Sequence, residues 1–167
     1  NNSILTEKEL ALINTPFIAE NVRNHSMKNK IKRKEIAYFL NEIIKTKKIQ
    51  NNSKSTPIID DLNNTQYQDA IRNIVKLNIM STNENKFQPN KTVTLAEFLA
   101  AISNTFQYTD IDQTYHLNNL NKTAWDYKYL KIGLQKNIIT KKDIQYKSNP
   151  LTIESFYKYA ARIHGEP

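Results

Sequence analysis

Three cationic side chains lie at the predicted start of a helix, where a binding site for an anion is expected. Lys32, Arg33 and Lys34 precede Glu35 and an amphipathic run that includes Ile36. The first turn of a helix presents free backbone N–H groups that bind anions, whereas cations there oppose the helix dipole. This unfavourable placement favours a role in ligand binding, with Arg33 as the main contact. A solvated cluster of cations is the structural alternative.

Two acidic residues and the single tryptophan are further candidates for ligand contacts. Asp60 and Asp110 occur in the patterns Ile58-x-Asp60 and Tyr108-x-Asp110. Aspartate at such positions also forms turns and caps, which is the alternative role. Trp125 offers a flat apolar face that suits the CH groups of a sugar ring. Its alternative role is packing, partly buried, against the start of a helix.

The sequence shows no arrangement typical of catalysis or metal binding. The Asp110-x-Asp112-x-Thr114 pattern lacks the glycine and the final glutamate that a calcium loop requires. Cysteine is absent, which excludes disulfides, cysteine-based zinc sites and thiol nucleophiles. Motifs of serine hydrolases, phosphate loops and zinc proteases are also lacking. We therefore predict a protein that is not an enzyme and uses neither a metal nor a cofactor.

Helical patterns that recur about every 60 residues position these candidates. Amphipathic runs with a helical period place Ile36, Phe98 and Phe156 in corresponding positions. Two other helical segments also correspond, and they end in Asn78-Ile79 and Asn137-Ile138. Asparagine readily adopts the left-handed conformation that ends a helix, so both are predicted to end helices. A less clear first helix is predicted at residues 6–13.

The starts of the three amphipathic helices differ in their capping residues. Thr94 and Glu97 form a predicted capping box, in which each side chain bonds to the backbone of the other residue. Thr152 is predicted to cap its helix without such a box. At the first helix, Glu35 is kept but Lys32 replaces the capping residue.

These features resemble the S-layer homology (SLH) domain, whose repeat contains F-x-D, then W-A-x-x-A-I and G-I, then F-x-P and T-R-A-E-F. Repeat two, about 57–106, fits best, with Ile58-x-Asp60, Phe87-x-Pro89 and Thr94-Leu95-Ala96-Glu97. Repeat three, about 107–164, carries extra residues between Asp110 and Trp125. Repeat one, about 4–49, fits mainly around Arg33.

The resemblance implies one mainly α domain over residues 1–167. Its three helix-loop-helix repeats would form a pseudo-threefold, three-pronged spindle with a central helical bundle. It also implies a non-catalytic, extracellular module that anchors a surface or S-layer protein to the cell wall. The implied partners are an anionic, typically pyruvylated, secondary cell wall polysaccharide or peptidoglycan, and other surface-layer proteins are a further candidate.

In this family the arginine of T-R-A-E pairs with the acidic sugar substituent in a groove between prongs. Here that arginine occurs only as Arg33, because Leu95 and Ile153 occupy the equivalent positions. The resemblance therefore implies at most one groove of the usual type, between Arg33 and residues 58–60. The other grooves are expected to be inactive, to use Lys91 or Lys147, or to bind something else.

Composition leaves two further functions open. The formal net charge of +8 favours a polyanionic partner, including a nucleic acid as the least favoured alternative. A protein-interaction or assembly module is the second alternative, and exposed apolar patches at Leu95 and Ile153 would support it. The sequence contains no apolar run long enough to cross a membrane.

Overall fold

The helices of this chain alternate with irregular connecting segments. The computed structural model describes residues 27–49, 56–109, 112, 114 and 116–163. Its helices are α2 (Arg33–Lys47), α3 (Gln68–Lys76), α4 (Leu95–Phe106), α5 (Tyr127–Gln135), the 3-10 helix η1 (Lys141–Tyr146) and α6 (Ile153–Ala160). Extended pairing within these ranges is limited to isolated bridges. The prediction of a mainly α fold is therefore confirmed.

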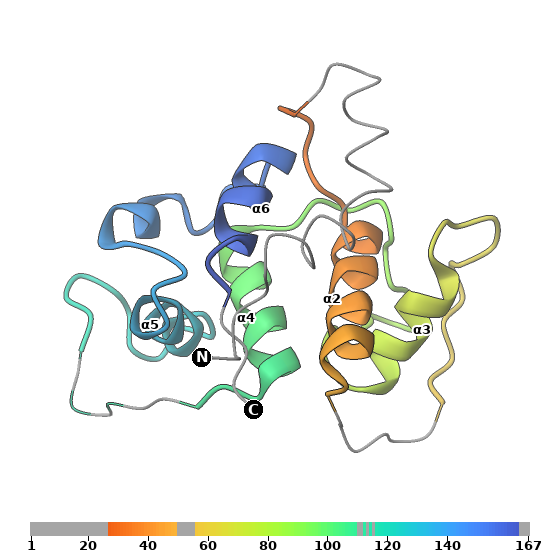
Figure 1. Cartoon of the computed structure of the whole chain (residues 1–167), viewed down its shortest axis with the longest axis horizontal. Coiled ribbons are helices and arrows are strands. Elements are labelled where there is room, and N and C mark those ends of the chain that lie inside the picture. Colours follow the sequence, from red (N-terminus) through yellow and green to blue (C-terminus); the bar gives the residue numbers. More distant parts are fainter. Residues whose placement is uncertain (1–26, 50–55, 110–111, 113, 115, 164–167) are drawn as a thin grey trace.

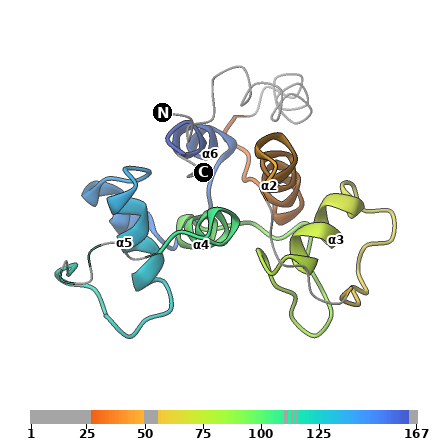
Figure 2. The ribbon, with the colours of Figure 1, turned by 60° about the horizontal axis from the view of Figure 1, so that its bottom comes forward.

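Helices α2, α4 and α6 form the centre of the described structure, while α3 and α5 lie outside them (Figures 1 and 2). The central contact is aromatic. The Phe156 ring meets the Phe39 ring edge-on at 4.8 Å between centroids, and the Phe98 ring at 5.7 Å. All three phenylalanines are fully buried. The residues predicted to correspond, Ile36, Phe98 and Phe156, thus share one apolar core.

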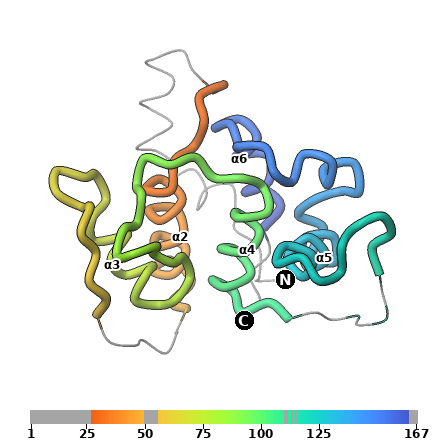
Figure 3. Tube along the Cα trace, turned by 180° about the vertical axis from the view of Figure 1, so that it is seen from behind, coloured from red at the N-terminus to blue at the C-terminus, as the bar shows by residue number. Residues whose placement is uncertain are grey.

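Equivalent backbone hydrogen bonds join the three central helices in a closed cycle. The second residue of each helix donates to a carbonyl in the segment that precedes the next helix. The three bonds are Lys34 N to Pro89 O, Ala96 N to Lys147 O and Glu154 N to Met27 O, each of 3.0 Å. Figure 3 shows one such crossing, where the chain between α3 and α4 passes the start of α2. The complete three-pronged spindle stays a prediction, because residues 6–13 lie outside the described residues.

The predicted helix ends are confirmed. Asn78 and Asn137 both have a φ of 59°, in the left-handed region. The N–H of Ile79 returns to Ile74 O at 3.1 Å, and that of Ile138 returns to Gly133 O at 2.9 Å. These bonds satisfy carbonyls that the helix would otherwise leave free. Both isoleucines are buried, so each helix end also fixes the core.

The predicted helix starts are confirmed as well. Thr94 N donates to Glu97 Oε1 at 2.8 Å, and Glu97 N donates to Thr94 Oγ1 at 3.2 Å. Thr152 Oγ1 accepts from Ser155 N at 3.0 Å. At α2 only the glutamate half survives, as Lys32 N donates to Glu35 Oε1 at 3.0 Å. None of the helices in the described residues is long and apolar enough to cross a membrane.

Candidate functional site

The Arg33 side chain is held in place by the segment between α3 and α4. Its Nε donates to Phe87 O at 2.8 Å, and its Nη2 donates to Ser81 O at 2.8 Å. The guanidinium also lies over the Phe87 ring, 4.4 Å from its centroid. A planar guanidinium suits both contacts, because it stacks on aromatic faces and donates along fixed directions. Lysine could not reproduce this arrangement.

The guanidinium of Arg33 forms no ion pair with a described residue. No carboxylate there forms an ion pair with it, and its two hydrogen bonds end on neutral carbonyls. Burial lowers the pKa of Arg33, while the negative charges of Glu97 and Asp61 act in the opposite direction. An arginine stays protonated even in such surroundings. The result is a fixed, partly desolvated positive charge.

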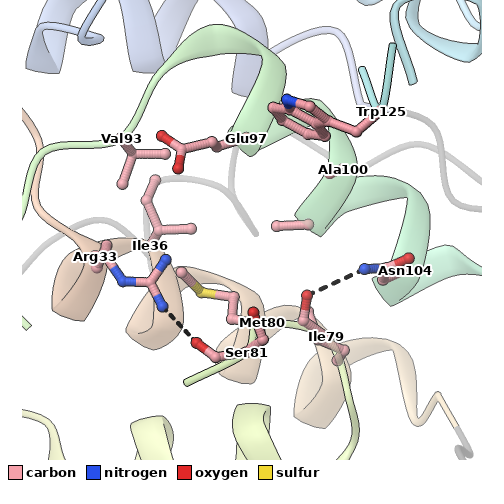
Figure 4. Close-up of a pocket in the computed structure, with 11 residues that line it drawn as sticks. Arg33, Ile36, Ile79, Met80, Ser81, Val93, Glu97, Ala100, Asn104 and Trp125 are labelled. Atoms are coloured by element: carbon pink, nitrogen blue, oxygen red, sulfur yellow. Dashed lines mark hydrogen bonds between the residues drawn. The ribbon is translucent and has the colours of Figure 1, made fainter. Parts of the chain in front are cut away.

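Arg33 faces a pocket of about 210 Å³ built from elements that are distant in the sequence. It is lined by Arg33, Ile36, Ile79, Met80, Ser81, Val93, Glu97, Ala100, Ala101, Asn104 and Trp125. Figure 4 shows Arg33 on one side and Trp125 at the opposite edge, with α4 between them. Trp125 is 60% exposed, which is unusual for so large an apolar side chain. The pocket therefore combines a positive charge with an accessible flat ring.

An ion pair fixes the segment that carries Trp125. Asp126 is buried, and its Oδ2 lies 2.6 Å from Lys147 Nζ. The carbonyl of Lys147 accepts from Ala96 N at the start of α4. Lys147 thus links the residue next to Trp125 to the helix that forms the floor of the pocket. Its amine, predicted as a ligand contact in another groove, is already engaged by Asp126.

The other predicted site residues lie elsewhere. Lys32 and Lys34 flank Arg33 but do not line the pocket. Asp60 is exposed, and its N–H donates to Asn85 O at 2.8 Å. Asp110 lies outside the described residues. The pocket wall expected at residues 58–60 is instead formed by residues 79–81 and α4, so the structure brings together only Arg33 and Trp125.

The carboxylate that binds the backbone N–H groups of Phe87 and Gln88 belongs to Asp61. Asp61 comes one position after Asp60, the aspartate that the sequence pattern indicated. Its Oδ1 accepts from Phe87 N and its Oδ2 from Gln88 N, both at 2.8 Å. Ile59 is buried, whereas Ile58 is 70% exposed. The pattern of an apolar residue and an aspartate two positions later is therefore Ile59-x-Asp61. The doubled Ile-Ile-Asp-Asp makes both registers equally consistent with the sequence.

We expect Asp61→Ala to destabilise the protein while Asp60→Ala leaves it nearly unchanged. Removal of Asp61 leaves two backbone donors without a charged acceptor, which costs roughly 2–4 kcal/mol in total. The exposed Asp60 side chain should contribute less than about 0.5 kcal/mol. Urea unfolding of the two variants measures this difference. Equal losses of stability would show that the register assigned here is wrong.

On α4, the position that corresponds to Arg33 is occupied by Leu95. Leu95 there lines a second pocket of about 310 Å³ with Asp143, Tyr146, Asn149, Pro150, Leu151, Ser155, Lys158 and Tyr159. Leu95 and Ile153 are each 1% exposed. They do not form the exposed apolar patches that an assembly module was expected to show. Lys91 lies beside Arg33, where its carbonyl accepts Arg33 N at 2.9 Å.

The second pocket contains a buried aspartate with several donors. Asp143 accepts from Thr140 N at 2.8 Å, Thr140 Oγ1 at 3.0 Å and Tyr159 OH at 3.0 Å. Lys158 Nζ lies 3.6 Å from the same carboxylate. Burial alone would raise the pKa of Asp143, but these hydrogen bonds and the Lys158 charge together lower it. Burial and the bond to Asp143 raise the pKa of Tyr159 to about 12.

Because the folded-state pKa of Asp143 lies below the unfolded value, its contribution to stability is complete above the unfolded pKa. That contribution is lost as the pH falls through the folded pKa. We expect Asp143→Ala to lower the free energy of unfolding by roughly 2–4 kcal/mol at pH 7. The gap between wild type and variant should narrow below about pH 4. Urea unfolding across this range tests the prediction, and a gap that does not change with pH would contradict it.

The described residues hold no group of three or more histidine, cysteine or acidic side chains that could bind a metal ion. Asp112 has a local role, because its Oδ1 accepts from Thr114 N at 3.0 Å and from the Thr114 hydroxyl at 2.6 Å.

Ser81 and Phe87 were not predicted as site residues. Phe87 belongs to the Phe87-x-Pro89 motif, but Ser81 contributes only a carbonyl and leaves no signal in the sequence.

Comparison with known families finds one match, which covers part of the chain. Residues 58–99 match the model of the S-layer homology domain, and this segment runs from the residues before α3 into α4. The predicted resemblance to the S-layer homology domain is thus confirmed for residues 58–99. The match does not extend to the first and third predicted repeats. A search of curated proteins found no significant match.

The S-layer homology domain is a non-catalytic family that binds cell-wall polymers. Its presence associates this chain with the cell surface and supports a role in anchoring. The prediction of a wall-associated module is confirmed at this level, and the non-catalytic nature of the family is consistent with the prediction that the chain is not an enzyme. The polymer and the residues that contact it are matters for proposal.

Proposed function

We propose that this chain anchors a surface protein to the cell wall by binding an anionic polysaccharide at Arg33. The observation that supports this most strongly is the immobilised Arg33 guanidinium, which has no ion pair among the described residues. A carboxylate, such as the pyruvyl group of a secondary wall polysaccharide, accepts two hydrogen bonds from such a group. Nη1, which makes no hydrogen bond to a described residue, is oriented by the two bonds already present.

The neighbouring residues suit a sugar ring. Trp125 supplies an exposed aromatic face, and the CH groups of a sugar pack on such a face. Asn104 supplies a polar group along α4, whereas Glu97 uses one carboxylate oxygen to cap that helix. In this proposal the acidic substituent binds Arg33 while the ring that carries it lies toward Trp125, within a pocket of about 210 Å³.

Retention on purified cell-wall sacculi tests the proposed function. The chain should sediment with sacculi that keep their secondary polysaccharide, and should remain in solution when that polymer has been removed chemically. Because the contact is ionic and only partly buried, binding should weaken as salt rises. Equal retention on stripped sacculi would shift the proposal to peptidoglycan, and no retention on either would refute it. Tryptophan fluorescence gives an independent signal, because Trp125 is the only tryptophan.

A further inference from the structure

A second, larger cavity shares no lining residue with the Arg33 pocket. Its volume is about 790 Å³, within the roughly 300–1,000 Å³ of typical ligand sites. It is lined by His116, Leu117, Asn118, Asn119, Leu120, Lys141, Ile144, Gln145, Lys147 and Ser148. In Figures 1 and 2 these two segments, teal and blue, lie on the α5 side of the molecule, away from α3. The segment 116–120 belongs to the extra residues that precede Trp125.

Both walls of this cavity are anchored to the rest of the protein. Leu117 is buried, and its N–H donates to Tyr127 OH at 2.9 Å. On the opposite wall, η1 is fixed to α6 by the hydroxyl of Tyr159, which donates to the buried Asp143 at 3.0 Å. The ion pair between Lys147 and Asp126 holds the end of that wall. The cavity is therefore formed before any ligand arrives, which lowers the entropic cost of binding.

The lining has the chemistry of a site for an acidic sugar. His116, Asn118, Asn119, Lys141 and Ser148 line it without a side-chain hydrogen bond or ion pair to any described residue. Amides and hydroxyls pair with sugar hydroxyls in both directions, and Lys141 supplies a cation for a carboxylate. Leu120 and Ile144 supply apolar surface. The described lining contains neither an acidic side chain that would repel an anion nor a Phe, Tyr or Trp on which a nucleobase would stack.

We propose that this cavity is a second binding site, which takes a carboxylated sugar unit. Lys141 binds the carboxylate, and the amides of Asn118 and Asn119 bind the ring hydroxyls. The site is formed by two segments, 116–120 and 141–148, and Arg33 does not line it. Two sites on one rigid module would let it hold a polyanionic chain at two points, which raises the apparent affinity without a new contact at either.

Titration of the ¹⁵N-labelled chain with glucuronic acid, followed by NMR, tests this proposal. We expect chemical-shift changes in residues 116–120 and 141–148, and a weaker response to glucose, which lacks the carboxylate. Lys141→Ala should weaken binding of glucuronic acid roughly tenfold, because it removes a charge-assisted contact. Lys142→Ala is the matched control, since it removes the same charge from the adjacent exposed residue, which does not line the cavity. Asn118→Ala should weaken the response to both sugars.

Three results would overturn the proposal. They are the absence of shifts in these residues, an equal response to glucose, and equal weakening by Lys141→Ala and Lys142→Ala. The Arg33→Ala variant keeps the test separate from the proposed function. Its affinity for sacculi should fall, and it should keep its response to glucuronic acid in residues 116–120 and 141–148. Loss of that response in Arg33→Ala would also count against a second site.

Discussion

Replacing Arg33 with alanine is expected to lower the affinity for polysaccharide-bearing sacculi about 30-fold or more. Truncation of one partner in a desolvated, hydrogen-bonded charge pair costs roughly 2–5 kcal/mol, and each 1.4 kcal/mol is tenfold in affinity. Arg33 meets these conditions, because it is partly buried and already bonded to Ser81 O and Phe87 O. The measurement is a binding isotherm on purified sacculi at constant salt.

Arg72→Ala is the matched control for this prediction. Arg72 is exposed on α3, so its removal causes the same change in net charge without touching the pocket. Its effect on affinity should be less than about twofold, as expected of an exposed charge. Arg33→Lys should fall between wild type and Arg33→Ala, because it keeps the charge and loses the planar donors. Equal losses in Arg33→Ala and Arg72→Ala would mean that net charge alone causes binding.

Folding of the Arg33 variant must be checked, because Arg33 also supports the segment between α3 and α4. Loss of its two hydrogen bonds and of its contact with the Phe87 ring removes an estimated 1–3 kcal/mol of stability. This leaves most of a typical domain stability of about 5–15 kcal/mol. Trp125→Ala gives a second test of the same pocket, because the exposed ring makes little contribution to the core. It should weaken binding without a comparable loss of stability.

Local signals made the helix ends predictable from the sequence. Asn78 and Asn137 end helices because asparagine tolerates a left-handed backbone, and this property belongs to the residue itself. The Thr94–Glu97 capping box likewise depends only on two residues three positions apart. The 3-10 helix η1 was not predicted, since six residues carry too little periodicity to mark an element. Its start at Thr140 and Asp143 has the same spacing as a capping box.

The pocket could be predicted only in part, because its parts come from distant positions. Arg33 was predicted because a cation is unfavourable at a helix start, and Trp125 was predicted because its flat ring suits a sugar. No sequence pattern indicated that both line one pocket. The register of Asp60 and Asp61 could not be chosen locally either. Burial of Ile59 instead of Ile58 selects Asp61, and burial is a property of the packed core.

Packing of the core also accounts for the lack of an arginine at the position on α4 that corresponds to Arg33. Arg33 is held in place because Ser81 and Phe87 offer carbonyls and a ring to its guanidinium. Leu95 occupies the corresponding place on α4 and is almost fully buried. The polar residues of that second pocket, Asp143, Tyr159 and Lys158, bond to one another. Their mutual bonds favour stability over ligand binding in that pocket.

Phe156→Ala is expected to cause the largest loss of stability. Phe156 is fully buried and lies edge-on to Phe39 and Phe98, so one ring connects α6 with both α2 and α4. Removal of a buried phenylalanine costs about 3–5 kcal/mol, through lost burial and through the cavity that remains. Such a loss is a large fraction of the stability of a typical domain. Urea unfolding, followed by far-UV circular dichroism, measures it.

Phe106→Ala is the matched control for Phe156→Ala, because it makes the same substitution outside the central contact. Phe106 lies at the end of α4, is only half-buried and stacks on Tyr108 at 5.4 Å between centroids. The same truncation should therefore cost roughly 1–2 kcal/mol there. If α2, α4 and α6 share one core, Phe156→Ala should lower the midpoint of a single transition. Two separate transitions in wild type, or equal costs for the two variants, would show that the three helices do not fold as one unit. In that case the cycle of hydrogen bonds would be too weak to keep Arg33 and Trp125 in one pocket.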